Sequence, residues 1–223
     1  MHDIQKVVLK RLLDKNGQKY AQLTRGYSYE ENVVFHLKQL IGKGLISKTD
    51  GDYSITAQGV KEITGFDLNQ LADTGFKTFF FGFLCSFQNK YLIKEHPQGP
   101  TNFYNLPSGK PNFGEPVEAG LIRTFADNTG ITLSPDDFRF LTLHLKTVKT
   151  AVAEALFDDA FAIYEVNLTE EQFNQSELLP TLSWKGIDEI ENLNNRWPEI
   201  DICILQKNRS QYMAYEFVSD YIL

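Results

Sequence analysis

The sequence predicts an α+β chain of two domains: a small helical domain, and a larger domain in which helices flank a mixed sheet. Three observations support this prediction. Apolar residues recur at helical spacing between Ile4 and Ile63. Later in the chain, apolar and polar residues alternate in runs typical of half-buried strands. A polar stretch bounded by glycines separates the two regions. We therefore place the first domain at residues 1–65, a linker at 66–75 and an α/β/α sandwich at 76–223.

The composition is that of a soluble globular protein, with 42% hydrophobic and 23% charged residues. No apolar run approaches the length of about 18 residues that a membrane helix needs. Lys6 and Lys10 interrupt the first ten residues, so no apolar h-region of a signal peptide is expected there. Cys85 and Cys203 lie in apolar runs, so we expect buried free thiols and a reducing, cytoplasmic environment.

Charge is distributed unevenly along the chain. Residues 1–65 carry ten basic and seven acidic side chains, a net charge of +3, whereas the remainder carries 12 basic and 22 acidic ones, a net charge of −10. A basic first domain on an acidic body favours contact between the first domain and a polyanion.

The first domain is expected to combine helices with one hairpin. Ser28-Tyr29-Glu30-Glu31 is a capping-box pattern that opens a helix, and Asp50-Gly51 is a hairpin turn signal. In order, the expected elements are a helix at Ile4–Lys15, a short helix at Tyr20–Arg25, a helix from Tyr29 to about Gly42, hairpin strands at Gly44–Lys48 and Tyr53–Thr56, and a short helix at Gln58–Ile63.

Three helices and a hairpin resemble a winged helix-turn-helix. The segment HLKQLIGKGLISKTDGDYSITAQG is similar to the recognition helix, wing and exit helix of that family, and the resemblance covers residues 4–64. It implies that the helix from Tyr29 enters the major groove of DNA. The implied backbone contacts are Arg25, Lys38, Lys43 and Lys48, and the implied base-edge contacts are Asn32, His36 and Gln39.

An alternative for the first domain is a role in dimerisation or protein docking, which winged helices also serve. Glu30 and Glu31 favour the start of a helix. They also repel phosphate at the end of the helix that should face the bases.

The second domain is expected to contain strands with interspersed helices. The expected elements are strands at Phe79–Phe87 and Lys90–Lys94, a loop at Pro97–Asn105, a strand within Asp137–Lys149, a strand at Ala160–Val166, a helix at Thr169–Ser176, a strand carrying Trp184 that leads into a short helix near Ile190, a strand or helix start at Ile202–Leu205, and a final helix from Gln211 to Ile222.

The segment Leu106–Ile131 organises this domain. Its first part is a turn built from Pro107, Ser108, Gly109 and Gly114. A helix with an apolar face follows. Pro116 suits the first position of this helix, and Gly130 suits the position just past its end.

This segment resembles the Nudix box, G-x5-E-x7-R-E-U-x-E-E-x-G-U, where U is aliphatic. Gly109, Glu115, Arg123, Gly130 and Ile131 fall in register without a gap. In that family the box is a loop–helix–loop whose carboxylates hold a divalent metal ion against the diphosphate of a nucleoside diphosphate derivative, which water then attacks. The resemblance spans about residues 76–205.

The match breaks where the family has three glutamates, at Thr124, Asp127 and Asn128, which share one helix face. Only Asp127 is acidic, so we expect that the scaffold is retained, braced by a Glu115–Arg123 pair, and that the catalytic carboxylates are lost. The alternative is an active hydrolase of nucleoside diphosphate derivatives in which Asp127 and Glu115 hold Mg²⁺ or Mn²⁺.

The prediction is therefore a cytoplasmic, homodimeric transcriptional regulator that binds DNA and senses a nucleotide-type metabolite. It is similar to Nudix-related transcriptional regulators, with the domain order reversed. Ligand binding is expected to favour a dimer in which the winged domains no longer match the spacing of two half-sites. The expected ligand contacts are Lys110, which meets a phosphate, Phe103, which stacks on a base or ribose, and Glu115, Arg123 and Asp127.

Overall fold

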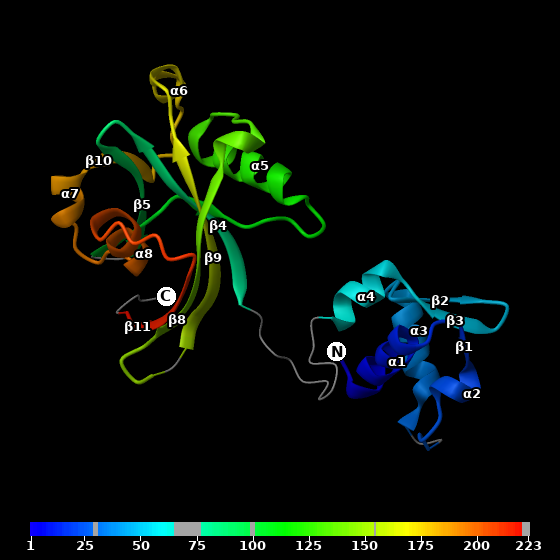
Figure 1. Ribbon diagram of the computed structural model, residues 1–223. Coiled ribbons are helices and arrows are strands. Elements are labelled where there is room, and N and C mark those ends of the chain that lie inside the picture. Colours follow the sequence, from blue (N-terminus) through cyan, green and yellow to red (C-terminus); the bar gives the residue numbers. More distant parts are fainter. Residues whose placement is uncertain (29–30, 65–76, 99–100, 154, 220–223) are drawn as a thin grey trace. The chain divides into compact units, whose positions relative to one another are not determined.

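The computed structural model describes residues 1–28, 31–64, 77–98, 101–153 and 155–219. The chain divides into two units, residues 1–76 (unit 1) and 77–223 (unit 2), whose elements are labelled in Figure 1. The expected linker at 66–75 lies outside the described residues.

The described part of unit 1 combines α-helices with a small antiparallel sheet in the order β1-β3-β2. Asp50 and Gly51 both have positive φ, +53° and +83°, and form the tight turn between β2 and β3 that this dipeptide predicts. The elements are α1 (Asp3–Asp14), β1 (Gln18–Lys19), α2 (Tyr20–Leu23), α3 (Val33–Gly42), β2 (Ile46–Thr49), β3 (Asp52–Ile55) and α4 (Ala57–Ile63).

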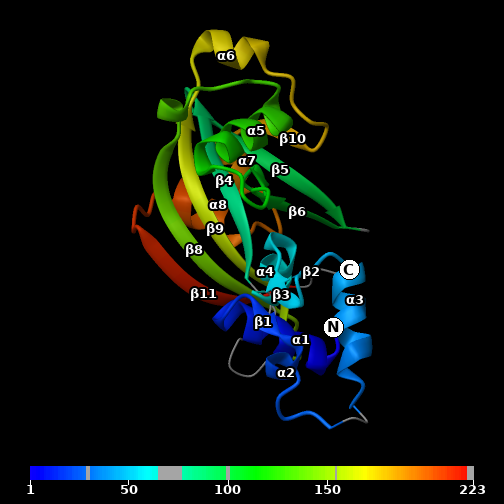
Figure 2. The same ribbon diagram turned by 90° about the vertical axis from the view of Figure 1, so that its right-hand side faces the viewer.

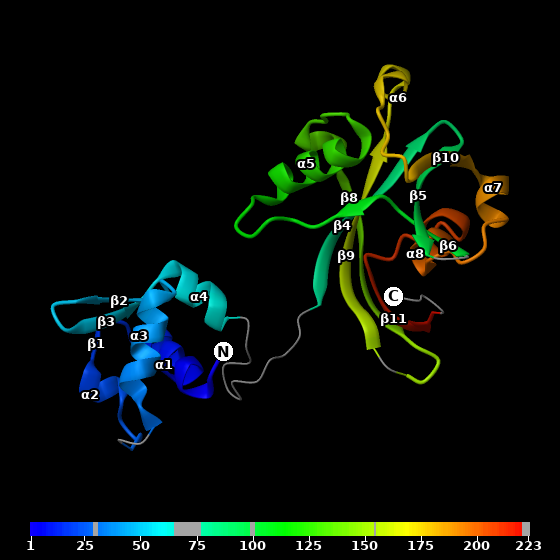
Figure 3. The same ribbon diagram turned by 180° about the vertical axis from the view of Figure 1, so that it is seen from behind.

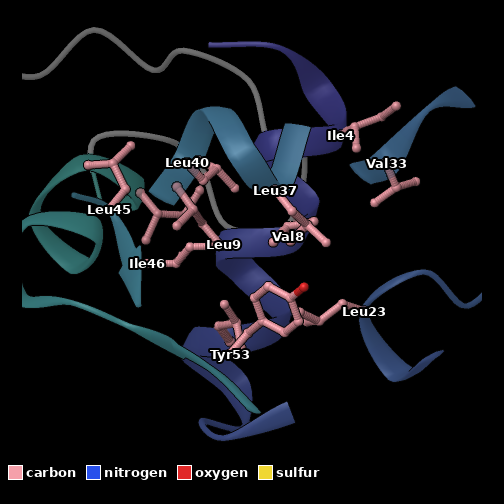
Figure 4. Close-up of a cluster of buried hydrophobic side chains, with 12 residues drawn as sticks. Ile4, Val8, Leu9, Leu23, Val33, Leu37, Leu40, Leu45, Ile46 and Tyr53 are labelled. Atoms are coloured by element: carbon pink, nitrogen blue, oxygen red, sulfur yellow. The ribbon is translucent and has the colours of Figure 1, made fainter. Parts of the chain in front are cut away.

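The core of unit 1 lies between α1, α3 and the hairpin, as Figure 4 shows. Val8 and Leu9 of α1 are fully buried, and so is Leu40 of α3. The buried residues of α1 and of α3 recur at intervals of three or four positions along each helix, so each helix places one apolar stripe against the other.

One element of unit 1 starts later than predicted. Helix α3 begins at Val33, and Asn32 is its N-cap. Asn32 has φ +45°, a left-handed conformation that interrupts a helix, and its side-chain oxygen accepts a hydrogen bond from the Phe35 amide at 3.4 Å. The Glu31 carboxylate accepts a hydrogen bond from the Ser28 amide at 2.6 Å. The predicted capping pair therefore forms in a turn that precedes the helix.

Unit 2 is built on a mixed sheet in the order β10-β5-β4-β9-β8-β11, with β6 paired to β5 and β7 paired to β4. The pairs β4–β9 and β8–β11 are parallel. The strands are β4 (Thr78–Phe87), β5 (Lys90–Gln98), β6 (Thr101–Asn105), β7 (Ser108–Gly109), β8 (Arg139–Lys149), β9 (Ala155–Asn167), β10 (Leu182–Gly186) and β11 (Tyr212–Val218).

Helices cover both faces of this sheet, so the predicted three-layer arrangement of unit 2 is present. On one face, Phe83 of β4 packs against Phe125 of α5. On the other face, Ile163 of β9 packs in one cluster with Ile190 and Ile200. The helices are α5 (Val117–Thr129), α6 (Glu170–Gln175), α7 (Ile187–Glu191) and α8 (Pro198–Ile200), which runs into a helical turn at Asp201–Leu205.

Three predictions for unit 2 were wrong. The final helix is instead strand β11, in which exposed and half-buried residues alternate at every position, a period of two that belongs to a strand. The loop at Pro97–Asn105 is partly strand, because β5 continues to Gln98 and pairs with β6. Pro116 is the N-cap of α5 rather than its first residue, while Gly130 ends the helix with φ +72°, as predicted.

Both cysteines are buried free thiols, as predicted. Burial raises the pKa of Cys203 to about 12. Among the described helices, none has the length and apolar character needed to cross a bilayer.

Candidate functional site

The loop that precedes α5 is closed onto the helix by Thr124. Strand β7 pairs with β4, where Gly109 lies opposite Phe81. A Cβ atom on Gly109 would lie 2.3 Å from Cγ2 of Thr124, so only glycine fits at this close approach. Thr124 is 2% exposed. The side chain at this position of the box is therefore part of the packing between loop and helix.

Asn128 of α5 forms a hydrogen bond to the same loop. Its Nδ2 donates to the Ser108 carbonyl at 3.3 Å and to the Thr124 carbonyl at 2.8 Å. Asn128 is 4% exposed. Two of the three positions where the family has glutamate thus hold buried side chains that join α5 to β7.

Arg123 organises the exposed side of the loop. Its Nε donates to Glu115 Oε1 at 2.7 Å and its Nη2 donates to Glu115 Oε2 at 2.8 Å, so the predicted brace forms as a two-point pair. Nη2 also donates to the Lys110 carbonyl at 3.1 Å. The hydrogen bonds from the Arg123 side chain, and then the one from the Asn112 amide, lower the pKa of Glu115 to about 2.

The two carboxylates expected to hold Mg²⁺ or Mn²⁺ are both engaged by this arginine, since Arg123 Nη1 donates to Asp127 Oδ2 at 3.2 Å. A cation at Glu115 would have to displace a bidentate guanidinium. Within the described ranges, no group of three or more His, Cys, Asp or Glu side chains is placed to hold a metal ion. This donor set does not fit a divalent cation.

A cavity of about 290 Å³ lies next to the box loop, on the sheet face that carries α8. Aromatic side chains from β4, β9 and the start of α8 form its walls. Polar groups from β5, β6 and the box loop reach into it. Its lining residues are Thr78, Phe80, His96, Asn105, Ser108, Lys110, Lys146, Phe157, Asp159, Phe161 and Trp197.

The charged groups of this cavity range from the buried Lys146 to the half-buried Asp159 and the exposed Lys110. Lys146 is 2% exposed, forms an ion pair with the fully buried Glu199, and lies 4.8 Å from the ring centre of Phe161 and 4.5 Å from that of Trp197. Burial lowers the pKa of His96 to about 4, with smaller contributions from Lys94 and Lys146. Its imidazole is therefore neutral at pH 7. Burial also raises the pKa of Asp159.

Of the predicted ligand contacts, only Lys110 lines the cavity, where its Nζ lies 5.1 Å from the ring centre of Phe80. The expectation for Phe103 was wrong. Phe103 is 7% exposed, packs with Val148 and Trp197 in an apolar cluster, and is not among the residues that line this cavity.

The sequence reasoning missed Lys146, Asp159 and Trp197. The pattern pointed the other way for Lys146, since Leu143 and Leu145 alternate with it along β8 and would be expected to face inward, whereas the structure buries Lys146. A charged residue is buried in this way only when paired. Its partner Glu199 is 53 residues away, and this separation concealed the pair.

The residues of unit 1 expected to contact DNA are only partly available. Arg25, Lys38, Gln39 and Lys48 are exposed, and Asn32 caps α3. The expectation that His36 contacts a base edge was wrong. His36 is 9% exposed, and its ring stacks on that of His2 with the ring centres 4.3 Å apart. Its place on the core side of α3 keeps it from a base edge.

Helix α3 also exposes apolar side chains. Val34 is 44% exposed, Phe35 51% and Ile41 39%, on the same helix as Lys38 and Gln39. Scattered exposed apolar residues are common, but three on one helix give its outer surface a mixed character.

No protein-family profile and no curated protein sequence matches the chain. Three solved structures illustrate its likeness to known folds. The MutT protein of Bacillus halodurans is 18% identical (65% of this chain, 93% of that chain, TM-score 0.48). The Nudix domain of Shewanella oneidensis NrtR, solved with ADP ribose, is 11% identical (70% and 99%, TM-score 0.47). A Nudix hydrolase from Nitrosomonas europaea is 20% identical (61% and 91%, TM-score 0.42).

Proposed function

We propose that unit 2 is a Nudix-like domain that binds a nucleotide-type metabolite without hydrolysing it, and that unit 1 is a winged helix-turn-helix that reads DNA in the cytoplasm. Together they form a homodimeric transcriptional regulator. The observation that carries this proposal is the structural role of the side chains at the box positions. Thr124 and Asn128 are buried and hold the loop against α5, and Glu115 and Asp127 are paired with Arg123.

The cavity supports a ligand with an aromatic ring and an anionic group. Phe80, Phe161 and Trp197 offer apolar ring surfaces, and the neutral His96 and Asn105 offer hydrogen bonds to a heterocycle. Lys110 is exposed on the box loop and lines the cavity, a position suited to a phosphate group.

The proposed DNA contacts in unit 1 are the exposed Lys38 and Gln39 of α3, Lys48 of the hairpin, and Arg25. Protein docking is a second candidate for this unit. It is favoured by one specific observation, the exposed Val34, Phe35 and Ile41 on α3.

The ligand proposal is tested by calorimetry on the full chain with AMP, ADP and ADP-ribose, with and without Mg²⁺. We expect binding by at least one nucleotide, unchanged by Mg²⁺, weakened about tenfold by Lys110→Ala, and accompanied by no cleavage. Lys90→Ala, an exposed lysine at the β4–β5 turn outside the cavity, is the control. Mg²⁺-dependent release of a nucleoside monophosphate would overturn the proposal.

The role of unit 1 is tested by selecting binding sites from random duplex DNA. If α3 reads DNA, the selection yields a sequence motif, and Lys38→Ala weakens binding while Phe35→Ser leaves most of it. A protein-docking role gives no motif at any salt concentration.

A further inference from the structure

Asp159 of β9 presents a carboxylate to the cavity beside the box loop and is half-buried there. Burial raises its pKa, and the ammonium groups of Lys146 and Lys110 oppose this rise. No hydrogen bond or ion pair among the described residues engages its oxygens. A half-buried acceptor of this kind is stabilised when a ligand supplies the hydrogen-bond donors.

The strand register sets Asp159 in a polar row on the cavity side of the sheet. Thr78 of β4 lies beside it on one side and Lys146 of β8 on the other. The next row is aromatic, since Phe80 and Phe161 are register partners whose ring centres lie 5.6 Å apart. Figure 2 shows β4, β9 and β8 running side by side, and Figure 3 shows α8 on the side of these strands away from α5. The Asp159 carboxylate therefore lies next to a floor of two aromatic rings.

Polar side chains follow one another along the cavity. The Lys110 ammonium lies 5.1 Å from the ring centre of Phe80, in the row next to that of Asp159. Lys146 is directly opposed to Asp159 in the antiparallel pair of β8 and β9, which sets their Cβ atoms about 5 Å apart. Burial, and then charges that include Lys146, lower the pKa of His96. The order in space is thus Lys110, Asp159, Lys146 and His96.

This order matches the order of the parts of a nucleotide. With the phosphate at Lys110 and the base at His96, as proposed above, the ribose lies beside Asp159. The hydroxyl groups of a ribose donate hydrogen bonds, and a carboxylate has two oxygens that accept them. A phosphate in the same place would meet a like charge. The sugar is therefore the part of a nucleotide that suits this carboxylate.

We propose that Asp159 binds the 2′- and 3′-hydroxyl groups of a ribose, so that unit 2 takes ribonucleotides and discriminates against 2′-deoxyribonucleotides. One hydroxyl donates to each oxygen of the carboxylate, and the apolar face of the sugar packs on the rings of Phe80 and Phe161. An acidic side chain binds the ribose hydroxyl in the same way in dinucleotide-binding folds. A site built to accept a hydrogen bond from a ligand hydroxyl rejects the analogue that lacks it, because the acceptor then stays unpaired.

This inference deepens the proposed function by naming the sugar of the ligand, and it rests on that function for the binding of a nucleotide. The two fail in different ways. If no nucleotide binds, the proposed function fails and the inference falls with it. If the ribose and 2′-deoxyribose forms bind equally, the inference alone is overturned.

Calorimetry on the full chain tests the inference with AMP, ADP and ADP-ribose, each compared with its 2′-deoxyadenosine form. We expect the wild type to bind the 2′-deoxy form about tenfold more weakly, the loss that one hydrogen bond to a charged group produces. Both forms carry the same phosphates, so the ratio of their dissociation constants removes the general effect of charge on binding.

The variant Asp159→Ala should make the two forms bind equally, because neither sugar then has a carboxylate to bind. Asp158→Ala is the matched control and keeps the discrimination, since Asp158 is the next residue on β9, faces the opposite side of the sheet and pairs with Lys77. Lys110→Ala should weaken both forms by the same factor, because Lys110 acts on the phosphate. Thermal unfolding checks that each variant is folded. Discrimination that persists in Asp159→Ala overturns the assignment of the ribose to this carboxylate.

Discussion

The Arg123 guanidinium forms a two-point pair with the Glu115 carboxylate, through Nε–Oε1 and Nη2–Oε2 contacts of 2.7 and 2.8 Å. This pair joins the box loop to the middle of α5 and engages both oxygens of the Glu115 carboxylate, which also accepts a hydrogen bond from the Asn112 amide at 2.8 Å. The residues that mark the box in the sequence therefore act as structural elements of the domain.

Replacing Glu115 by Gln is expected to lower the melting temperature of unit 2 at pH 7. The lowered pKa makes the pair stabilising above about pH 4.5, the ordinary value for this carboxyl, and the contribution is lost as pH falls toward about 2. The gap between wild type and Glu115→Gln should therefore narrow on acidification, as measured by thermal unfolding from pH 7 to pH 3. Glu118→Gln, at an exposed site on the same helix, is the control and should show no such gap.

Placing glutamates at positions 124 and 128, where the Nudix box has them, should damage the fold without creating activity. Thr124→Glu and Asn128→Glu each place a charge where exposure is 2% and 4%, which we expect to cost about 3 kcal/mol of unfolding free energy. Urea unfolding measures the cost. Asp127→Glu, on the exposed side of the helix, should change stability by less than about 0.5 kcal/mol. A stable Thr124→Glu/Asn128→Glu variant that hydrolyses nucleotides with Mg²⁺ would contradict this reading of the site.

The buried Lys146–Glu199 pair should show strong coupling. Glu199→Gln leaves the Lys146 ammonium without its counter-charge in an apolar setting, at an expected cost of about 3–5 kcal/mol. The double variant Lys146→Met/Glu199→Gln removes the stranded charge and should recover much of that loss. Urea denaturation of the wild type, the two single variants and the double variant gives the coupling energy. If the destabilisations of the two single variants simply add in the double variant, the two side chains are not coupled and the prediction fails.

Acidification should weaken unit 1 through His36. Burial, and then the neighbouring His2, lower the pKa of His36 below its ordinary value of 6.5. The unfolded chain therefore takes up the proton first, and stability falls as pH drops through about 6.5. NMR titration of the His36 ring should give a midpoint below 6.5, and His36→Phe should flatten the pH dependence of unfolding. A midpoint at or above 6.5 would contradict the burial argument.

The periodicity of apolar residues and the residues typical of turns were sufficient to predict most helices and strands. The apolar spacing of α1 and α5, the Asp50-Gly51 turn and the terminal Gly130 each report local preferences that the tertiary structure leaves unchanged. Strand β11 was misassigned because its alternation is between exposed and half-buried residues, a weak contrast in sequence. Its pairing with β8, far away in the chain, is what makes it a strand.

The sequence by itself determined the two-part order of helices and strands, the box register and the Glu115–Arg123 pair, because these depend on neighbours within one turn or one helix. Only the tertiary structure decided that Thr124 and Asn128 are buried and hold the loop against α5, that Phe103 is core, and that Lys146, Asp159 and Trp197 share a cavity. The burial and ion pairing of a side chain depend on the distant strands and helices that pack against it. The local sequence pattern does not identify those elements.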